Sequence, residues 1–171
     1  MRSNADRIGI KYSPLAPYEV LQTRSMSADD ILNAMQMSRM TDLYYNCPTW
    51  QKVIRGMISE MFIKDFTGYL KSRMLLDSPV SIERRGVILY EYCKLHHPEK
   101  LTDVSVAWIE AGHSLKKEPA GDIVKIKNLE GYLAEHQAQM RVEYGQATSS
   151  HRYFLLTSGN RRLIFGYDSE V

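Results

Sequence analysis

The chain has 171 residues, of which 44% are hydrophobic and 25% charged, a composition typical of one globular domain of ordinary size. Its 22 basic residues are nearly balanced by 20 acidic ones, so it lacks the clustered basic excess of proteins that bind nucleic-acid phosphates. No stretch approaches membrane-spanning length, and the amino terminus has no apolar signal region. We therefore expect a cytoplasmic protein with no membrane partner, and nucleic acid is not the expected partner.

The first 25 residues predict an extended connector. Residues 8–12 alternate apolar and polar side chains, and an extended pattern resumes over residues 19–23. Between them, Pro14 and Pro17 force an extended or turning path because proline fixes φ and biases its predecessor away from helix. This opening has little core of its own, which suits a peptide laid across another surface.

Helices are expected from residue 26 to residue 115. Ser27 is a good N-cap, with Asp29 and Asp30 in the first turn of a helix that ends at Tyr44-Tyr45-Asn46. A second helix follows from the apolar spacing of residues 50–62, with a break near Asp65 and a continuation to residue 74. Further helices are expected from a start at residues 77–79 and over residues 101–111, where Gly112 stops the last one.

The sequence after residue 116 indicates strands. Residues 116–121 are polar and rich in helix breakers, so they are the best linker candidate. A strand is expected at 123–126, a short helix at 129–136, an extended segment at 141–144, and a β-hairpin over 151–167. The predicted class is α+β, mainly a helical bundle followed by a small antiparallel β-hairpin sheet. The predicted domains are a connector over 1–25, a helical domain over 26–115, and an α/β tail with the C-terminal hairpin over 116–171.

Three short motifs carry a resemblance to a known family. They are Gly9-Ile10-Lys11-Tyr12, Pro17-Tyr18-Glu19-Val20-Leu21 and Tyr44-Tyr45-Asn46. In order and type they resemble the region just past the barrel in cobalamin-binding radical SAM proteins, often named Fe-S oxidoreductases. In that family a G-I-x-Y segment, then P-Y-E-V-L-x-T, then a helix ending in Y-Y-N leads into a C-terminal domain of unknown function. The quotable likeness covers the first quarter of the chain, and only the order of elements is similar beyond it.

The resemblance implies a non-catalytic C-terminal accessory domain of a radical SAM oxidoreductase. Such a domain would cover the barrel or shape substrate access, with the upstream radical SAM core of the same chain as its partner. The implied parent uses a [4Fe-4S] cluster, S-adenosylmethionine and cobalamin. This chain has two distant cysteines, Cys47 and Cys93, and neither a CxxxCxxC motif nor the D-x-H-x-x-G motif common in cobalamin proteins. We therefore expect no catalytic residue, metal ligand or cofactor-binding residue here, and we expect the parent's cofactor sites to lie upstream of Met1.

Tyr18, Tyr44, Tyr45 and Asn46 are the candidate substrate or interface contacts. In the functional interpretation, the Tyr44-Tyr45-Asn46 side chains lie near the mouth of the parent barrel. In the structural interpretation, which we favour, Tyr44 is core, Tyr45 is a boundary residue, and Asn46 is a C-cap that tolerates left-handed geometry.

Other polar residues leave alternatives open. His96-His97 suits capping of a helix end, and His113 with Glu110 could form an acid–base pair, although a structural role is the favoured one. Arg152, together with Arg161 and Arg162, flanks aromatic strand residues, a pattern also seen on platforms for single-stranded nucleic acid. The alternative function is therefore a free-standing helical interaction module that binds protein or RNA. It would hold residues 8–21 against its own core, whereas a severed accessory domain would not.

Overall fold

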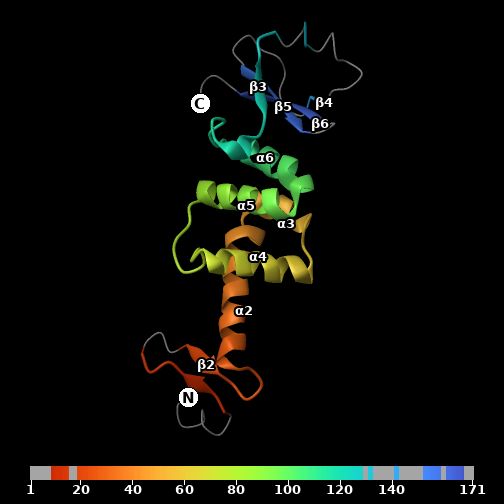
Figure 1. Cartoon of the computed structure of the whole chain (residues 1–171). Coiled ribbons are helices and arrows are strands. Elements are labelled where there is room, and N and C mark those ends of the chain that lie inside the picture. Colours follow the sequence, from red (N-terminus) through yellow and green to blue (C-terminus); the bar gives the residue numbers. More distant parts are fainter. Residues whose placement is uncertain are drawn as a thin grey trace. The chain divides into compact units, whose positions relative to one another are not determined.

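The computed structural model of the chain describes residues 9–15, 19–128, 131–132, 141–142, 152–158 and 161–167. Within them the predicted α+β class is confirmed, since helices dominate the first part of the chain and most strand residues follow residue 122 (Figure 1). The chain divides into two compact units, Met1–Arg85 and Gly86–Val171. The domain boundaries expected after residues 25 and 115 remain predictions.

The first unit opens with a two-stranded antiparallel ribbon. Strand β1, Lys11–Tyr12, pairs with β2, Val20–Gln22, and the register shifts between Lys11 and Tyr12. The ribbon lies beside the amino-terminal end of the first long helix (Figure 1). The two extended segments expected from the sequence are therefore confirmed, and they pair with each other.

Helix α2, Ala28–Met40, begins at a capping box. The backbone N–H of Asp30 donates to Ser27 Oγ at 3.2 Å, and the Asp30 carboxylate accepts from the Ser27 N–H at 2.9 Å. The Ser27 hydroxyl also donates to this carboxylate at 2.7 Å, and hydrogen bonds from Ser27 lower the pKa of Asp30. The predicted N-cap is confirmed. At its other end α2 passes directly into a π-helical turn, Thr41–Tyr45.

The helical stretch after Cys47 is interrupted earlier than expected. Helix α3, Pro48–Arg55, ends at Gly56, and α4, Glu60–Ser72, starts at a new cap where the Phe62 N–H donates to Ser59 Oγ at 3.0 Å. The expected single helix over residues 50–62 and the break near Asp65 are therefore wrong. Glycine is a poor helix former and serine is a strong N-cap, and together they outweigh an apolar spacing that runs through both helices.

The core of the first unit is aromatic. Phe66 of α4 stacks on Phe62 with ring centroids 5.4 Å apart and meets Tyr44 edge to face at 4.9 Å. Trp50 is fully buried, as the sequence predicts. Edge-to-face and offset-stacked rings add to the stabilisation from burial itself, so this cluster holds the π-helical turn against α4.

Helix α5, Ile82–His96, runs across the boundary between the two units. It begins later than the start expected at residues 77–79. The Arg84 N–H donates to Ser81 Oγ at 3.2 Å and the Arg85 N–H donates to the Ser81 carbonyl at 2.9 Å. Ser81 therefore caps the helix, and the Asp77-Ser78-Pro79 segment precedes it.

In the second unit a 3-10 turn, Pro98–Lys100, leads into α6, Leu101–Glu110. The expected stop at Gly112 is confirmed, since Gly112 has a φ of +72° that favours glycine. Trp108 is fully buried and its Nε1 donates to the Ser114 carbonyl at 3.0 Å. A second 3-10 turn, Glu118–Ala120, then carries the chain into the sheet (Figure 1).

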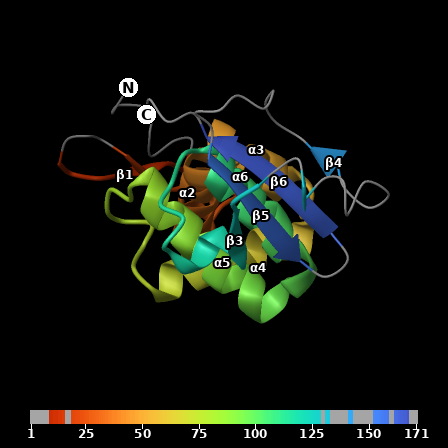
Figure 2. The same cartoon turned by 90° about the horizontal axis from the view of Figure 1, so that it is seen from above.

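The sheet has the order β3-β5-β6-β4 (Figure 2). Its strands are β3, Ile123–Ile126; β4, Arg141–Val142; β5, Arg152–Ser158; and β6, Arg161–Tyr167. The predicted hairpin is confirmed, because β5 and β6 pair antiparallel along their whole length. The sheet also contains a parallel pair, β4 with β6, which the sequence did not predict. The helix expected over residues 129–136 lies almost wholly outside the described residues.

Replacing Ser59 tests the position of the helix break. We expect Ser59→Ala to lower the free energy of unfolding by about 1 kcal/mol, because it removes the side-chain acceptor of the α4 cap. The exposed Ser78→Ala serves as the matched control and should leave stability within about 0.5 kcal/mol. Urea unfolding followed by circular dichroism measures both, and an unchanged Ser59→Ala variant would place the helix start elsewhere.

Candidate functional site

The candidate residues 44–46 lie on the π-helical turn that ends α2. The backbone N–H of Asn46 donates to the Thr41 carbonyl at 2.8 Å, five residues back, which is the pattern of a π-helix. Such turns occur often at functional sites. The turn gives each of the three side chains a different environment, and this separates their roles.

Tyr44 faces the interior. Its side chain is 1% exposed, it packs against Phe66, and its hydroxyl donates to the Arg85 carbonyl at 3.3 Å. Burial raises the pKa of Tyr44 well above its usual range, so this hydroxyl stays protonated as a hydrogen-bond donor. The expected core position of Tyr44 is therefore confirmed.

The Arg85 side chain, from the last residue of the first unit, hydrogen-bonds to the π-helical turn. Its Nε donates to the Val80 carbonyl at 2.9 Å, and its Nη1 donates to the Leu43 carbonyl at 3.2 Å. With the bond from Tyr44 back to the Arg85 carbonyl, this arginine links the π-helical turn to the start of α5. Hydrogen bonds from a charged donor are stronger than those from a neutral one, so these contacts hold the Leu43 and Val80 carbonyls firmly.

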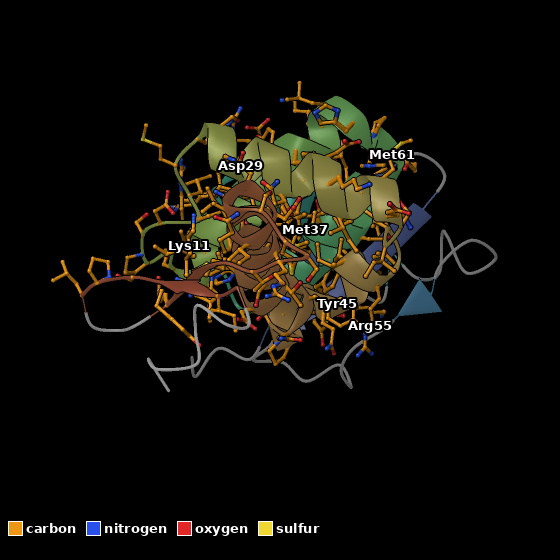
Figure 3. All side chains as sticks on the ribbon, turned by 90° about the horizontal axis from the view of Figure 1, so that it is seen from below. Lys11, Asp29, Met37, Tyr45, Arg55 and Met61 are labelled. Carbon is orange, nitrogen blue, oxygen red and sulfur yellow. The ribbon has the colours of Figure 1, made fainter. Side chains whose placement is uncertain are left out.

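Tyr45 and Asn46 face outward. The Tyr45 ring is half-buried, with the exposed Arg55 guanidinium 5.4 Å from its centroid, within cation–π range (Figure 3). Asn46 is exposed, and its Nδ2 donates to Asp42 Oδ1 at 2.9 Å. Asn46 is the C-cap, as predicted, but its φ of −86° is right-handed, so the left-handed geometry was wrong. We call Asp42, Tyr45, Asn46 and Arg55 the Tyr45 surface.

The remaining predicted contact, Tyr18, lies outside the described residues. The structure therefore brings together Tyr44, Tyr45 and Asn46 and leaves Tyr18 as a prediction. Sequence reasoning missed Asp42, whose spacing of four residues from Asn46 on a helix was a usable signal. It also missed Arg55, and no local pattern could have paired this residue with Tyr45 across the junction at Cys47 and Pro48.

The segment before this turn exposes apolar side chains. No described residue between Gly9 and Arg39 is buried. Five large hydrophobic side chains in this segment are exposed, with exposed fractions of 39% to 75%. We call them the N-terminal apolar residues: Leu15, Leu21, Met26, Leu32 and Met35. Scattered apolar residues are normal on protein surfaces. Here none of the 28 described residues at 9–15 and 19–39 is buried, which indicates a segment with little core of its own.

The cysteines do not fit an iron–sulfur cluster. Such a cluster is held by several thiolates close together, whereas Cys47 and Cys93 are the chain's two cysteines and both are buried. Burial raises the pKa of Cys93 to about 12, which disfavours the thiolate form that ligates metals. Within the described ranges, no cluster of three or more histidine, cysteine or acidic residues could hold a metal ion.

Three histidines lie among the described residues of the second unit, each beside an aromatic ring or a carboxylate. His113 packs its ring on Trp108 with centroids 4.7 Å apart, and His96 lies against Tyr92 at 4.7 Å. His97 approaches Glu99, with Nδ1 3.3 Å from Oε1. The acid–base pair of His113 with Glu110 stays a prediction. Among the helices of the described part, none is both long and apolar enough to cross a membrane.

Comparison with known proteins gives one family. The model of a family described as "Protein of unknown function (DUF4080)" matches residues 6–107, which is more than half of the chain. No curated protein and no solved structure shows a significant match. The matched range contains the ribbon, the π-helical turn, the Tyr45 surface and the N-terminal apolar residues.

The different roles of Tyr44 and Tyr45 can be measured through stability. We expect Tyr44→Ala to cost about 3–5 kcal/mol because it empties a closed aromatic site. Tyr45→Ala should cost less than about 1 kcal/mol, since it removes a half-buried ring and one surface cation–π contact. Equal losses in urea unfolding would contradict this assignment of Tyr44 to the core and Tyr45 to the surface.

Thiol reactivity tests the burial of Cys93. In a Cys47→Ala variant, we expect 5,5′-dithiobis(2-nitrobenzoate) at pH 8 to react with Cys93 far more slowly in the folded chain than in urea. The physical reason is the raised pKa of this thiol together with its burial. Similar rates in the folded and unfolded chains would show that Cys93 is accessible.

Proposed function

We propose that this chain, which belongs to the DUF4080 family of proteins of unknown function, is a non-catalytic accessory domain of a radical SAM Fe-S oxidoreductase. In this proposal it covers the barrel or shapes substrate access. Its partner is the radical SAM core upstream in the same chain. The [4Fe-4S] cluster, S-adenosylmethionine and cobalamin belong to that core, because the two cysteines of this chain do not fit a cluster.

The observation that carries the proposal is the exposure of the segment from Gly9 to Arg39. The motifs that resemble the end of the radical SAM barrel fall in or next to this segment, and its described residues bury no side chain. Burying one large apolar side chain contributes about 1.5–3 kcal/mol, so the N-terminal apolar residues represent several kcal/mol of stabilisation that the isolated chain does not use. Docking on an adjacent protein body would use it.

The Tyr45 surface is the second element of the proposed contact. It presents the Tyr45 ring and the Arg55 guanidinium near the end of the same helical stretch (Figure 3). The carboxylate–amide pair of Asp42 and Asn46 lies on the same turn. Tyrosine and arginine are enriched among the residues that dominate binding energy at protein interfaces. Tyr45 and Asn46 are accordingly the residues that we assign to contact with the core or its substrate.

The alternative, a free-standing helical interaction module, fits the opening segment less well. A module that folds and acts alone would hold this segment against its own core. Leu15 and Leu21 are instead 75% and 45% exposed. The ribbon pairs with itself and contacts the start of α2, but these contacts bury none of its described side chains.

The genome that encodes the chain tests the parentage. We expect the reading frame to continue upstream of Met1 and to encode a CxxxCxxC motif, because a radical SAM cluster needs three neighbouring thiolates. Sequencing of the locus gives the answer directly. A stop codon in frame immediately upstream would contradict the proposal.

Docking can be tested with the chain and its upstream core produced as separate polypeptides. We expect the double substitution Leu32→Gln, Met35→Gln to weaken their association about tenfold or more, because both side chains are exposed on one face of α2. The free energy of unfolding of the chain alone should change by less than about 1 kcal/mol. The exposed Lys71→Gln on α4 is the control.

Isothermal titration calorimetry measures the association, and urea unfolding measures stability. Unchanged association in the double variant would contradict docking through α2. A large loss of stability would show that Leu32 and Met35 belong to a core.

A further inference from the structure

Strand β3 forms an open edge of the sheet in the second unit. It lies at the end of the order β3-β5-β6-β4 and, among the described strands, pairs with β5 alone. The Thr157 N–H donates to the Asp122 carbonyl at 3.3 Å, which sets the alternation of hydrogen-bonded pairs along β3 and β5. The N–H and C=O groups of Ile123 and Lys125 therefore point away from β5, where no described strand pairs with them.

The side chains of this edge are apolar on one face and basic on the other. Because side chains alternate along a strand, Val124 and Ile126 lie on one face and Lys125 lies on the opposite face. Val124 is 62% exposed. Lys127 follows directly after the strand, and no ion pair joins either lysine to a described residue. Both lysines are exposed, so their charges are available to a binding partner.

A pocket of about 350 Å³ adjoins the apolar face of β3. Val124, Ile126, Leu155 and Tyr132 line it, together with both lysines. Ile126 and Leu155 belong to the buried cluster on this face of the sheet, and Tyr132 packs against that cluster. The volume is at the lower end of the range for small-molecule sites, which leaves room for a large apolar side chain.

We propose that the edge of β3 binds an extended acidic peptide segment of a partner protein as an added strand. The peptide backbone forms hydrogen bonds with the outward groups of Ile123 and Lys125, which is the mode of β-augmentation. Its apolar side chains contact Val124 and enter the pocket. The residues between them are glutamate or aspartate, and their carboxylates pair with Lys125 and Lys127.

Charge disfavours a second copy of this chain as the occupant. Pairing of β3 with β3 of another molecule would bring the lysines of both copies together, and like charges on neighbouring strands are destabilising. Lysines on edge strands protect sheets from such self-pairing. The same lysines attract a strand that carries carboxylates. The inference concerns residues outside the matched range 6–107 and does not rest on the proposed docking of α2.

A fluorescein-labelled peptide of the sequence Glu-Val-Glu-Ile-Glu-Val-Glu is the probe. We expect fluorescence anisotropy with the full chain to show saturable binding with a dissociation constant of about 100 μM or tighter. The counterpart with lysine in place of every glutamate should bind about tenfold more weakly or worse, because Lys125 and Lys127 repel it. Equal binding of the lysine peptide, or no saturable binding of the acidic peptide by about 1 mM, would overturn the proposal.

N-methylated peptides separate strand pairing from simple attraction between charges. Two versions of the acidic peptide carry methyl groups on one or the other set of alternate amides. Only one set of amides faces β3 in an added strand, so one version should bind about tenfold more weakly and the other as the unmethylated peptide does. Equal binding of both versions would exclude strand addition.

Substitutions in the chain locate the site. The double substitution Lys125→Gln, Lys127→Gln should weaken binding of the acidic peptide about tenfold, because it removes both charges. Lys125→Pro should bind about tenfold more weakly than Lys125→Gln, since proline removes an N–H that points away from β5 and leaves the pairing with β5 in place. The exposed pair Lys71→Gln, Lys116→Gln is the charge-matched control and should bind as the unmodified chain does. Unchanged affinity in the double variant and in Lys125→Pro would contradict binding at β3.

Discussion

The hydrogen bonds of Arg85 are the constraint on which the first unit depends. A single guanidinium donates to the carbonyls of Val80 and Leu43, and the Tyr44 hydroxyl donates back to the Arg85 carbonyl. The bonds that join Arg85 to Leu43 and Tyr44 connect chain segments about 40 residues apart and hold the π-helical turn. Because Tyr44 is fixed inward, its neighbour Tyr45 must face outward. The local geometry of one turn thus decides which aromatic side chain is available for contact.

The first unit accordingly has two parts, which meet at Met40. After Met40 the chain is held by aromatic packing, with Phe66 between Tyr44 and Phe62. Before Met40 it is a ribbon and a capped helix with no buried described residue. Helix α2 is supported by its capping box, by its backbone hydrogen bonds and by contacts with α4, and a helix of this length is marginal without such packing. We propose that an adjacent protein body covers the exposed side of this segment, and this is the basis of the proposed accessory role.

Local signals in the sequence predicted most elements, and tertiary contacts account for the errors. Ser27 with Asp30, the buried tryptophans and the hairpin were predictable because caps, apolar spacing and strand propensity act over a few residues. The apolar residues between 50 and 62 keep one helical spacing through both α3 and α4. This spacing therefore gave no sign of the break at Gly56. The roles of Arg85 and Arg55 depend on chain segments that only folding brings together.

Hydrogen–deuterium exchange on the isolated chain tests the central claim most directly. The account predicts little protection for the amides of β1, β2 and the first turn of α2, because this segment has no core, and strong protection for α4 around Phe66. Protection of the ribbon amides equal to that of α4 would show that the segment is held by the chain's own fold. That result would contradict an accessory domain that completes its structure on a neighbouring core.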